Sequence, residues 1–287
     1  MKFVSFEHEG LHGFGLLSGK SIVDLTGKLS SDVVTLKQAI SAGLLARAAS
    51  WEGQPGEIAL DRAKLLPVIP DPGKILCIGL NYEDHRSETK RPPSDYPTVF
   101  TRFADSQVGH GQALLKPASS EKFDYEAELA IVIGARSHGV SEERALDIVA
   151  GYSCYNDGSV RDWQRHTSQF TPGKNFPATG GFGPALVTPD EVGDYRTLPI
   201  QLRLNGTIMQ DATLADLIFP IEKLIAYCSR FTPLSPGDVI VTGTPGGVGD
   251  RREPPVYLQD GDFVEVDIGI VGCLVNTVST APTPGTP

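Results

Sequence analysis

Short apolar segments separated by turn residues dominate the hydrophobic pattern of the chain. Their length and their content of β-branched residues predict strands, at 3–6, 14–17, 22–25, 74–79, 129–133, 200–204, 239–242 and 263–268. Fewer segments show helical spacing or a capped start, and these lie at 35–48, 141–149 and 219–230. Because the strands do not alternate regularly with helices, the pattern disfavours a doubly wound sheet or an α/β barrel. It favours a mostly β, α+β fold, as a sandwich, barrel or roll.

A proline-rich connector at 67–73 divides the chain. We expect a small N-terminal α/β domain over residues 1–66, whose first two strands are joined by a glycine-rich turn. A large domain is predicted over residues 72–278. The tail at 280–287 is rich in Pro and Thr, and we expect it to be disordered.

Composition excludes some classes of protein. The formal net charge of −10 disfavours a nucleic-acid partner, whose phosphates require Lys and Arg. There is no apolar run of about 18 residues, so no membrane-spanning helix is expected. Acidic residues appear too early in the chain for a secretory signal, and the simplest expectation is a cytoplasmic protein. The four cysteines are far apart and are expected to be buried, reduced thiols.

Two glutamates stand at the start of the predicted strand at 129–133. Side chains alternate along a strand, so Glu126 and Glu128 point to the same face. Adjacent carboxylates repel unless a cation lies between them, and oxygen ligands suit Mg²⁺, Mn²⁺ or Ca²⁺. Asp157 ends another apolar segment and could join them. The alternatives are a solvated strand face for the glutamates and ordinary turn chemistry for Asp157.

A histidine follows the first predicted strand of the large domain. If the chain becomes helical after Asn81, His85 and Glu88 lie three residues apart on one helix face. A carboxylate next to imidazole fixes its tautomer and raises its basicity, as a water-activating base requires. From spacing alone, an ion pair on the helix surface is the better explanation of these residues.

Two turns add further candidates. Lys174 lies in a turn beside apolar residues and could bind an anion or stabilise an enolate oxygen, or it could be an ordinary surface lysine. The glycine-rich segment 242–249 follows a predicted strand but lacks the P-loop and GxGxxG patterns. A turn whose backbone binds a carboxylate is the better functional interpretation, and a simple glycine turn is the alternative.

Taken in order, these segments resemble the fumarylacetoacetate hydrolase family. The resemblance covers residues 72–275 and rests on GLNY (79–82) with His85 and Glu88, DYEAEL (124–129), ND (156–157) with RDWQ (161–164), GKNF (173–176) and TGTPGGVG (242–249). It implies a mixed β-sandwich roll for the large domain and a homodimer. It also implies a mobile loop at about 85–96.

The resemblance also implies roles for individual residues. The expected metal ligands are Glu126, Glu128 and Asp157, with Mg²⁺ as the first choice. The expected catalytic residues are His85, Glu88, Lys174 and Gln164, and the expected substrate contacts are Tyr82, Arg102 and Thr244. The chain departs from the family at two places. Ile78 stands where the animal enzymes carry a further aspartate, and Arg102 lies in a strand where many members have a lysine.

The resemblance therefore predicts a metal-dependent hydrolase that cleaves the carbon–carbon bond of a small β-diketo acid, such as an acylpyruvate. The products would be a 2-oxo acid and a carboxylic acid. The same site could instead decarboxylate oxaloacetate, or tautomerise or isomerise a hydroxydienedioate. A catalytically silent binding protein that keeps the fold is the remaining alternative. The expected partner is a small 2-oxo acid, with no nucleic acid and no membrane.

Overall fold

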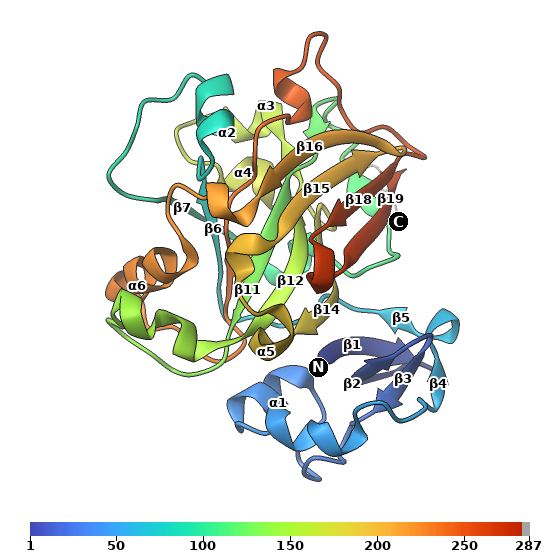
Figure 1. The fold of residues 1–287 in the computed structure, drawn as a ribbon. Coiled ribbons are helices and arrows are strands. Elements are labelled where there is room, and N and C mark those ends of the chain that lie inside the picture. The colour runs from blue at the N-terminus through green and yellow to red at the C-terminus, as the bar shows by residue number, and fades with distance from the viewer. Residues whose placement is uncertain (283–287) are drawn as a thin grey trace.

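The computed structural model describes residues 1–282, and strands dominate it (Figure 1). The strands of the main sheet are β1 (Lys2–His8), β2 (Leu11–Ser18), β3 (Ser21–Asp24), β4 (Ile58–Ala59), β5 (Lys64–Leu65), β6 (Ile75–Gly79), β7 (Thr98–Arg102), β8 (Gln107–Val108), β11 (Ala127–Ile133), β12 (Val149–Asp157), β14 (Gly180–Val187) and β17 (Val239–Val241). Those of the second sheet are β9 (Leu114–Lys116), β15 (Pro199–Leu204), β16 (Thr207–Thr213), β18 (Phe263–Asp267) and β19 (Cys273–Thr280). A separate short pair consists of β10 (Phe123–Asp124) and β13 (Ser159–Val160).

The helices are short. The α-helices are α1 (Leu36–Ser41), α2 (Glu83–Glu88), α3 (Arg161–Gln164), α4 (Thr171–Lys174), α5 (Pro189–Val192) and α6 (Ile221–Phe231). The 3₁₀ turns are η1 (Leu45–Trp51), η2 (Leu60–Arg62), η3 (Ala104–Ser106), η4 (Glu142–Ile148), η5 (Tyr195–Thr197), η6 (Leu214–Asp216), η7 (Gly249–Arg251) and η8 (Gly269–Val271).

The two large sheets form the mixed sandwich that the sequence predicts. Within residues 1–282 the main sheet has twelve strands, with the path β4-β3-β2-β1-β14-β12-β11-β17-β6-β7, and the second sheet has the order β16-β15-β18-β19-β9. Strand β11 is antiparallel to β12, whereas β17 runs parallel to β6. The strand predictions are therefore confirmed, and so is the mostly β, α+β class.

Strand β11 is buried on both faces. Leu129 and Ile131 pack with Ile200 of the second sheet in one apolar cluster. Ala130 and Val132 belong to the other large cluster, which faces the N-terminal strands. Because the side-chain period is two, Glu126 and Glu128 share the second of these faces, at the end of the strand where the apolar layer stops.

The N-terminal unit is joined to the large sheet through its first strand. Strand β1 pairs antiparallel with β14, with Phe3 opposite Leu186. The predicted glycine-rich turn between β1 and β2 is Glu9-Gly10, and both residues have positive φ, as a two-residue hairpin turn requires. The division of the chain into domains at 1–66 and 72–278 stays a prediction.

Two predicted helices differ from the structure. The helix expected over 35–48 ends at Ser41, because Gly43 adopts a φ of +67° and reverses the chain before η1 begins. The segment expected as a helix over 141–149 is the 3₁₀ turn η4, which follows Ser141. The helix expected over 219–230 is confirmed as α6.

The remaining expectations concern the membrane, the thiols and the tail. No helix in the described range is long and apolar enough to cross a bilayer. Cys77, Cys154 and Cys228 are buried free thiols, whereas Cys273 is half-buried. The tail predicted over 280–287 includes Thr280, which ends β19, and residues 283–287 lie outside the described range.

Candidate active site

Three carboxylates converge where β11 and β12 lie side by side. One oxygen from each of Glu126, Glu128 and Asp157 lies within 4.8 Å of the others, and all three residues are buried. The register explains the convergence, because Asp157 donates its N–H to the carbonyl of Glu126 at 2.9 Å and Tyr155 lies opposite Glu128. We call these three residues the acidic triad.

Glu126 is the member of the triad with two cationic partners. Arg161 lies 2.8 Å from its Oε1 atom, and Lys174 donates to its Oε2 atom. Burial raises the pKa of Glu126, but the charges of Arg161 and Lys174 outweigh burial and hold the pKa well below its usual range. Glu126 is therefore ionised in the folded protein.

Glu128 has no such partner. Its Oε2 atom accepts the backbone N–H of Gly243 at 2.6 Å, and it forms no ion pair with any residue between 1 and 282. Burial, with the like charges of Asp157 and Glu126, raises the pKa of Glu128 well above its usual value. A buried carboxylate beside two others and without a cation of its own is a site that a divalent cation would stabilise.

The donor set fits a hard cation. Carboxylate oxygens are the ligands that Mg²⁺, Mn²⁺ and Ca²⁺ prefer, whereas zinc sites commonly add nitrogen or sulfur. Within the described chain, the triad is the one cluster of three or more His, Cys, Asp or Glu side chains close enough to share an ion. Glu126, Glu128 and Asp157 would hold the ion, and water and substrate would complete its shell.

Asp157 is held from behind by Arg102. The Arg102 guanidinium is fully buried and donates to Asp157 Oδ1 at 2.7 Å, to the carbonyl of Gly158 at 2.9 Å and to Thr179 Oγ1 at 2.8 Å. Lys174 donates to the other Asp157 oxygen at 2.6 Å. Arg102 does not line the cavity described below, so the structure places it behind Asp157 and not among the expected substrate contacts.

The His85–Glu88 pair forms as the spacing predicts. Both residues lie on α2, and His85 Nδ1 is 2.7 Å from Glu88 Oε1. The His85 side chain is only 7% exposed, so the pair is not a solvated surface pair. A carboxylate can only accept a hydrogen bond, so Nδ1 carries a hydrogen and Nε2 of the neutral ring is free to take a proton.

The glycine-rich loop at 242–249 binds carboxylates, and in this structure they belong to the protein. The N–H of Gly243 donates to Glu128, that of Gly247 to Glu88 at 3.0 Å, and that of Gly249 to Asp124 at 2.9 Å. A side chain could not replace the hydrogen of Gly243, because its φ is +99° and a Cβ would lie 2.7 Å from Asn81. The loop therefore ties α2, β11 and β10 into one site.

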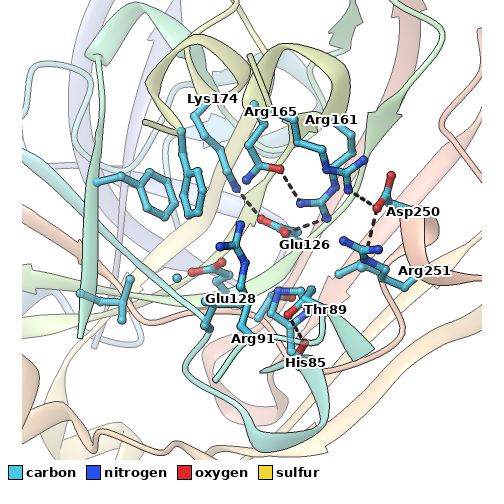
Figure 2. A pocket seen from close by; sticks show the side chains of 18 of the residues that line it. His85, Thr89, Arg91, Glu126, Glu128, Arg161, Arg165, Lys174, Asp250 and Arg251 are labelled. Carbon is cyan, nitrogen blue, oxygen red and sulfur yellow. Dashed lines mark hydrogen bonds and ion pairs between the residues drawn. The ribbon is translucent and has the colours of Figure 1, made fainter. Parts of the chain in front are cut away.

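A cavity of about 190 Å³ opens beside the triad. This volume is small against the ~300–1,000 Å³ of sites for drug-sized ligands. His85, Lys174, Gln164 and Thr244 line the cavity with Glu126 and Glu128. Figure 2 shows Lys174 on one side of Glu126 and Asp250 with Arg251 on the other.

Two predicted site residues, Thr244 and Gln164, form hydrogen bonds with other side chains of the protein. Thr244 Oγ1 accepts a hydrogen bond from Gln210 at 2.8 Å, and Gln164 accepts from Arg161 at 3.1 Å while both face the cavity. Tyr82 is 2% exposed, and burial raises its pKa. It lies outside the lining of this cavity, at the N-terminal end of α2.

Sequence reasoning assigned no role to several residues that the structure brings to the site. Asp124 accepts Arg161 Nε at 2.8 Å and two loop N–H groups, so it supports both Arg161 and the glycine-rich loop. Arg91, Arg165 and Arg251 line the cavity as well. Asp124 stands in the DYEAEL segment and could have been suspected there, whereas the arginines lie in loops that carry no local signal.

This mixed sandwich, with a buried oxygen-donor triad beside a small cavity and an imidazole–carboxylate pair at its edge, defines a class of enzymes that act on small molecules. The family model described as the fumarylacetoacetate (FAA) hydrolase C-terminal domain matches residues 74–279. The chain belongs to the fumarylacetoacetate hydrolase family, as the sequence predicted.

Individual relatives carry different activities. The mitochondrial oxaloacetate tautomerase of Xenopus laevis is 38% identical over 271 residues, covering 93% of this chain and 85% of the relative. The fumarylacetoacetate hydrolase of Exiguobacterium antarcticum is a solved structure with a TM-score of 0.83 and 33% identity, covering 98% of this chain and 100% of that one. Maleylpyruvate hydrolase from Sphingobium sp. SYK-6, solved with manganese(II) and pyruvate, has a TM-score of 0.82 and 28% identity over the same shares.

Proposed function

We propose that this enzyme interconverts the keto and enol forms of a small 2-oxo dicarboxylic acid, with oxaloacetate as the first candidate. The observation that carries the proposal is the small cavity, which is lined by Glu126 and Glu128 of the acidic triad together with Lys174 and His85. Tautomerisation needs an electrophile at the oxo group and a group that moves one proton. A cation bound by the triad would be the electrophile, His85 could move the proton, and no attacking water is required.

The metal site supplies the electrophile. A divalent cation held by Glu126, Glu128 and Asp157, with Mg²⁺ as our first choice, would polarise the 2-oxo group as a Lewis acid. A cation bound by three carboxylates would prefer further oxygen ligands. A substrate with a carboxylate next to its oxo group offers such oxygens. Small 2-oxo acids are therefore the substrate class that this site fits.

His85 is the group that we assign to the proton. Nε2 accepts the hydrogen from C3 as the C3–H bond breaks, and the electron pair moves to the 2-oxo oxygen. The same proton is then returned to that oxygen, which gives the enol, and the reverse sequence gives the ketone. Glu88 holds the ring through Nδ1 and stabilises its charged form.

Lys174 and Gln164 are placed to steady the oxygen on which negative charge develops. Burial lowers the pKa of Lys174, but Asp157 and Glu126 outweigh burial and raise it, so the side chain stays an ammonium group. A fixed cation in a site shielded from water stabilises an oxyanion more strongly than water does. Thr244 at the cavity wall completes the set of substrate contacts that we propose.

The relatives support tautomerisation more strongly than hydrolysis. The oxaloacetate tautomerase is similar over nearly the whole chain, at 38% identity, whereas the fumarylacetoacetate hydrolase shares 33% and the maleylpyruvate hydrolase 28%. Among the activities that the family resemblance allows, the relatives favour what began as the alternative interpretation of the sequence.

The test follows the enol directly. Enol-oxaloacetate is mixed with the Mg²⁺-loaded enzyme, and the loss of the enol's ultraviolet absorbance is compared with the rate given by Mg²⁺ alone. In D₂O, NMR would show faster deuterium incorporation at C3. No acceleration above the metal-only rate in either assay would rule tautomerisation out.

Carbon–carbon bond hydrolysis is the second candidate, because the buried His85–Glu88 pair could also take a proton from water. In that case ¹⁸O from labelled water enters the carboxylic acid released from an acylpyruvate. Mass spectrometry of the product separates the two reactions, since tautomerisation leaves the carbon skeleton intact and releases no acid.

We also propose a homodimer, as the family resemblance implies. Light scattering coupled to size-exclusion chromatography tests this, and a mass near that of one 30.7 kDa chain would contradict it.

A further inference from the structure

Two arginines besides Arg161 and Arg91 line the cavity, Arg165 and Arg251. Arg165 follows α3 and Arg251 ends η7, so they come from separate segments of the chain. Their side chains are 46% and 36% exposed, which leaves guanidinium surface open to a ligand. Figure 2 shows both arginines beside Asp250, with dashed lines joining each to its carboxylate.

Asp250 holds the two arginines in place. Its side chain is 4% exposed, and its Oδ2 atom binds Arg165 and lies 3.4 Å from Arg251 Nε. The other oxygen, Oδ1, accepts the hydroxyl hydrogen of Tyr257 at 2.9 Å. A buried carboxylate with three partners fixes where the two guanidinium groups lie, unlike an isolated ion pair on the surface. We call Arg165, Asp250 and Arg251 the arginine rim.

The rim is also fixed relative to the acidic triad. The backbone N–H of Asp250 donates to Asp124 Oδ2 at 3.0 Å. The same Asp124 oxygen accepts Arg161 Nε, and Arg161 in turn contacts Glu126. One chain of contacts thus connects the rim to the place where a metal-chelating group would bind.

The charges of the cavity favour a ligand with more than one negative charge. Two arginines share the single charge of Asp250, so the rim carries a surplus positive charge. Arg91 adds another from the loop after α2, and it forms no ion pair with any residue in the described range. Among the residues that line the cavity, Arg and Lys outnumber carboxylates by five to three, and Asp157, which pairs with Lys174, lies behind this lining.

We propose that Arg165 and Arg251, positioned by Asp250, bind the distal carboxylate of the substrate. The rim would thereby select 2-oxo dicarboxylic acids over 2-oxo acids that end in an uncharged group. A guanidinium presents parallel N–H donors that match the two oxygens of a carboxylate. This inference rests on the proposed function, in which the 2-oxo acid group of the substrate binds at the metal site. It adds the residues that bind the carboxylate at the other end.

The test is a binding measurement with ligands that cannot enolise. The Mg²⁺-loaded full chain is titrated calorimetrically with 3,3-difluoro-oxaloacetate, with the methyl ester of its distal carboxyl group, and with oxalate, which has no distal extension. We expect the unsubstituted enzyme to bind the free acid about tenfold more tightly than the ester, as for a charge-assisted contact that is partly exposed.

Three variants and one control locate the effect. Arg165→Gln and Arg251→Gln should each weaken the free acid about tenfold, and Asp250→Asn should weaken it less, because it loosens the arginines without removing them. None should change the affinity for oxalate or for the ester. Arg196→Gln is the matched control, since Arg196 is 48% exposed and ion-paired but lies outside the cavity.

The outcomes separate the two proposals. Equal weakening of the acid, the ester and oxalate would mean that the rim supports the fold of the site, and an unchanged affinity for the acid would mean that it does not touch the ligand; either result overturns the inference. If the unsubstituted enzyme prefers the free acid but does not accelerate tautomerisation, the rim stands and the proposed reaction fails.

Discussion

The acidic triad, through Glu126 and Glu128, and the arginine rim line the same cavity but are built differently. The triad side chains are at most 5% exposed and come from the ends of two paired strands, whereas the rim arginines are 36% and 46% exposed and come from short helical turns. A sheet fixes its side chains through register, and a loop fixes them only through its own contacts. Reaction chemistry and substrate choice can therefore reside on separate structural layers of one site.

The triad should be the more damaging place to break. Glu128→Gln keeps the shape of the side chain but removes a charge that a divalent cation needs. We expect activity to fall by about 10³-fold, comparable with the loss of a major electrostatic group. Mg²⁺ affinity, measured by calorimetry, should fall as well.

The same substitution should leave the metal-free protein as stable as before or more stable, because it removes a buried charge beside two like charges. Glu121→Gln is the matched control, since Glu121 is 79% exposed. A Glu128→Gln protein that keeps both Mg²⁺ affinity and activity would remove Glu128 from the metal site.

His85 tests whether the triad alone carries the chemistry. His85→Ala should lower kcat by about 10²-fold, a typical contribution of a positioned acid–base group, while the calorimetric Mg²⁺ affinity stays unchanged. His12→Ala controls for loss of a histidine, because His12 is 69% exposed. If kcat survives in His85→Ala, the proton must travel by another group.

A substitution at Asp124 should affect both the triad and the rim, because Asp124 contacts Arg161, which binds Glu126, and the backbone of Asp250. Asp124→Asn replaces one carboxylate oxygen with an amide N–H₂ group, so the N–H of either Gly249 or Asp250 would face a donor in place of an acceptor. We expect a loss of about 1–3 kcal/mol in the free energy of unfolding, measured by urea titration.

Because Asp124 links the layers, its substitution should weaken oxalate and the distal-carboxylate ligand together, unlike the rim variants. Asp194→Asn serves as the exposed control, with a side chain that is 55% exposed. Selective loss of only one of the two ligands would show that the layers are not mechanically joined through Asp124.

The smallest expected effect concerns pH and metal removal. In the folded, metal-free chain the pKa of Glu128 is raised above its ordinary value of 4.5, so the folded state holds this proton more tightly than the unfolded state. The free energy of unfolding should therefore decline as pH rises from about 4.5 toward the folded-state pKa of Glu128, by about 1 kcal/mol for each pH unit. Urea titrations in EDTA across this window measure the slope.

Glu128→Gln should reduce that slope, and saturating Mg²⁺ should reverse its sign, because the ion binds the ionised form. A slope that is identical with and without Glu128 would assign the pH dependence to other groups.

The strands and the triad could be predicted because their signals are local. The alternation that places Glu126 and Glu128 on one face is a property of any strand, and Asp157 was marked by the end of an apolar segment. The burial of His85 was not predictable, because the loop at 242–249 that packs against α2 lies far away in the chain. Nor could the sequence show that Arg102 points at Asp157 instead of toward a ligand.

The rim was missed for the same physical reason. In the sequence, Arg165 and Arg251 are ordinary charged residues, and only the folded chain pairs both with Asp250. The position of Asp250 in turn depends on its backbone hydrogen bond to Asp124. The helix expected at 35–48 was wrong for another reason. The helical spacing of apolar residues continues past Gly43, but the backbone leaves the helix before it. Periodicity reports which face is buried, and a single glycine decides where the element ends.

The pairing of β1 with β14 has a consequence for truncation. Strand β14 also pairs with β12, which carries Asp157, so the first residues of the chain cap the open flank of the strands that build the reaction centre. Removing residues 1–66 would leave unpaired backbone groups along β14 and would uncover the apolar cluster that Phe3 and Phe14 complete. Such a fragment would be prone to aggregate through that flank. A low activity of residues 67–287 alone would therefore reflect misfolding and not the loss of a catalytic group.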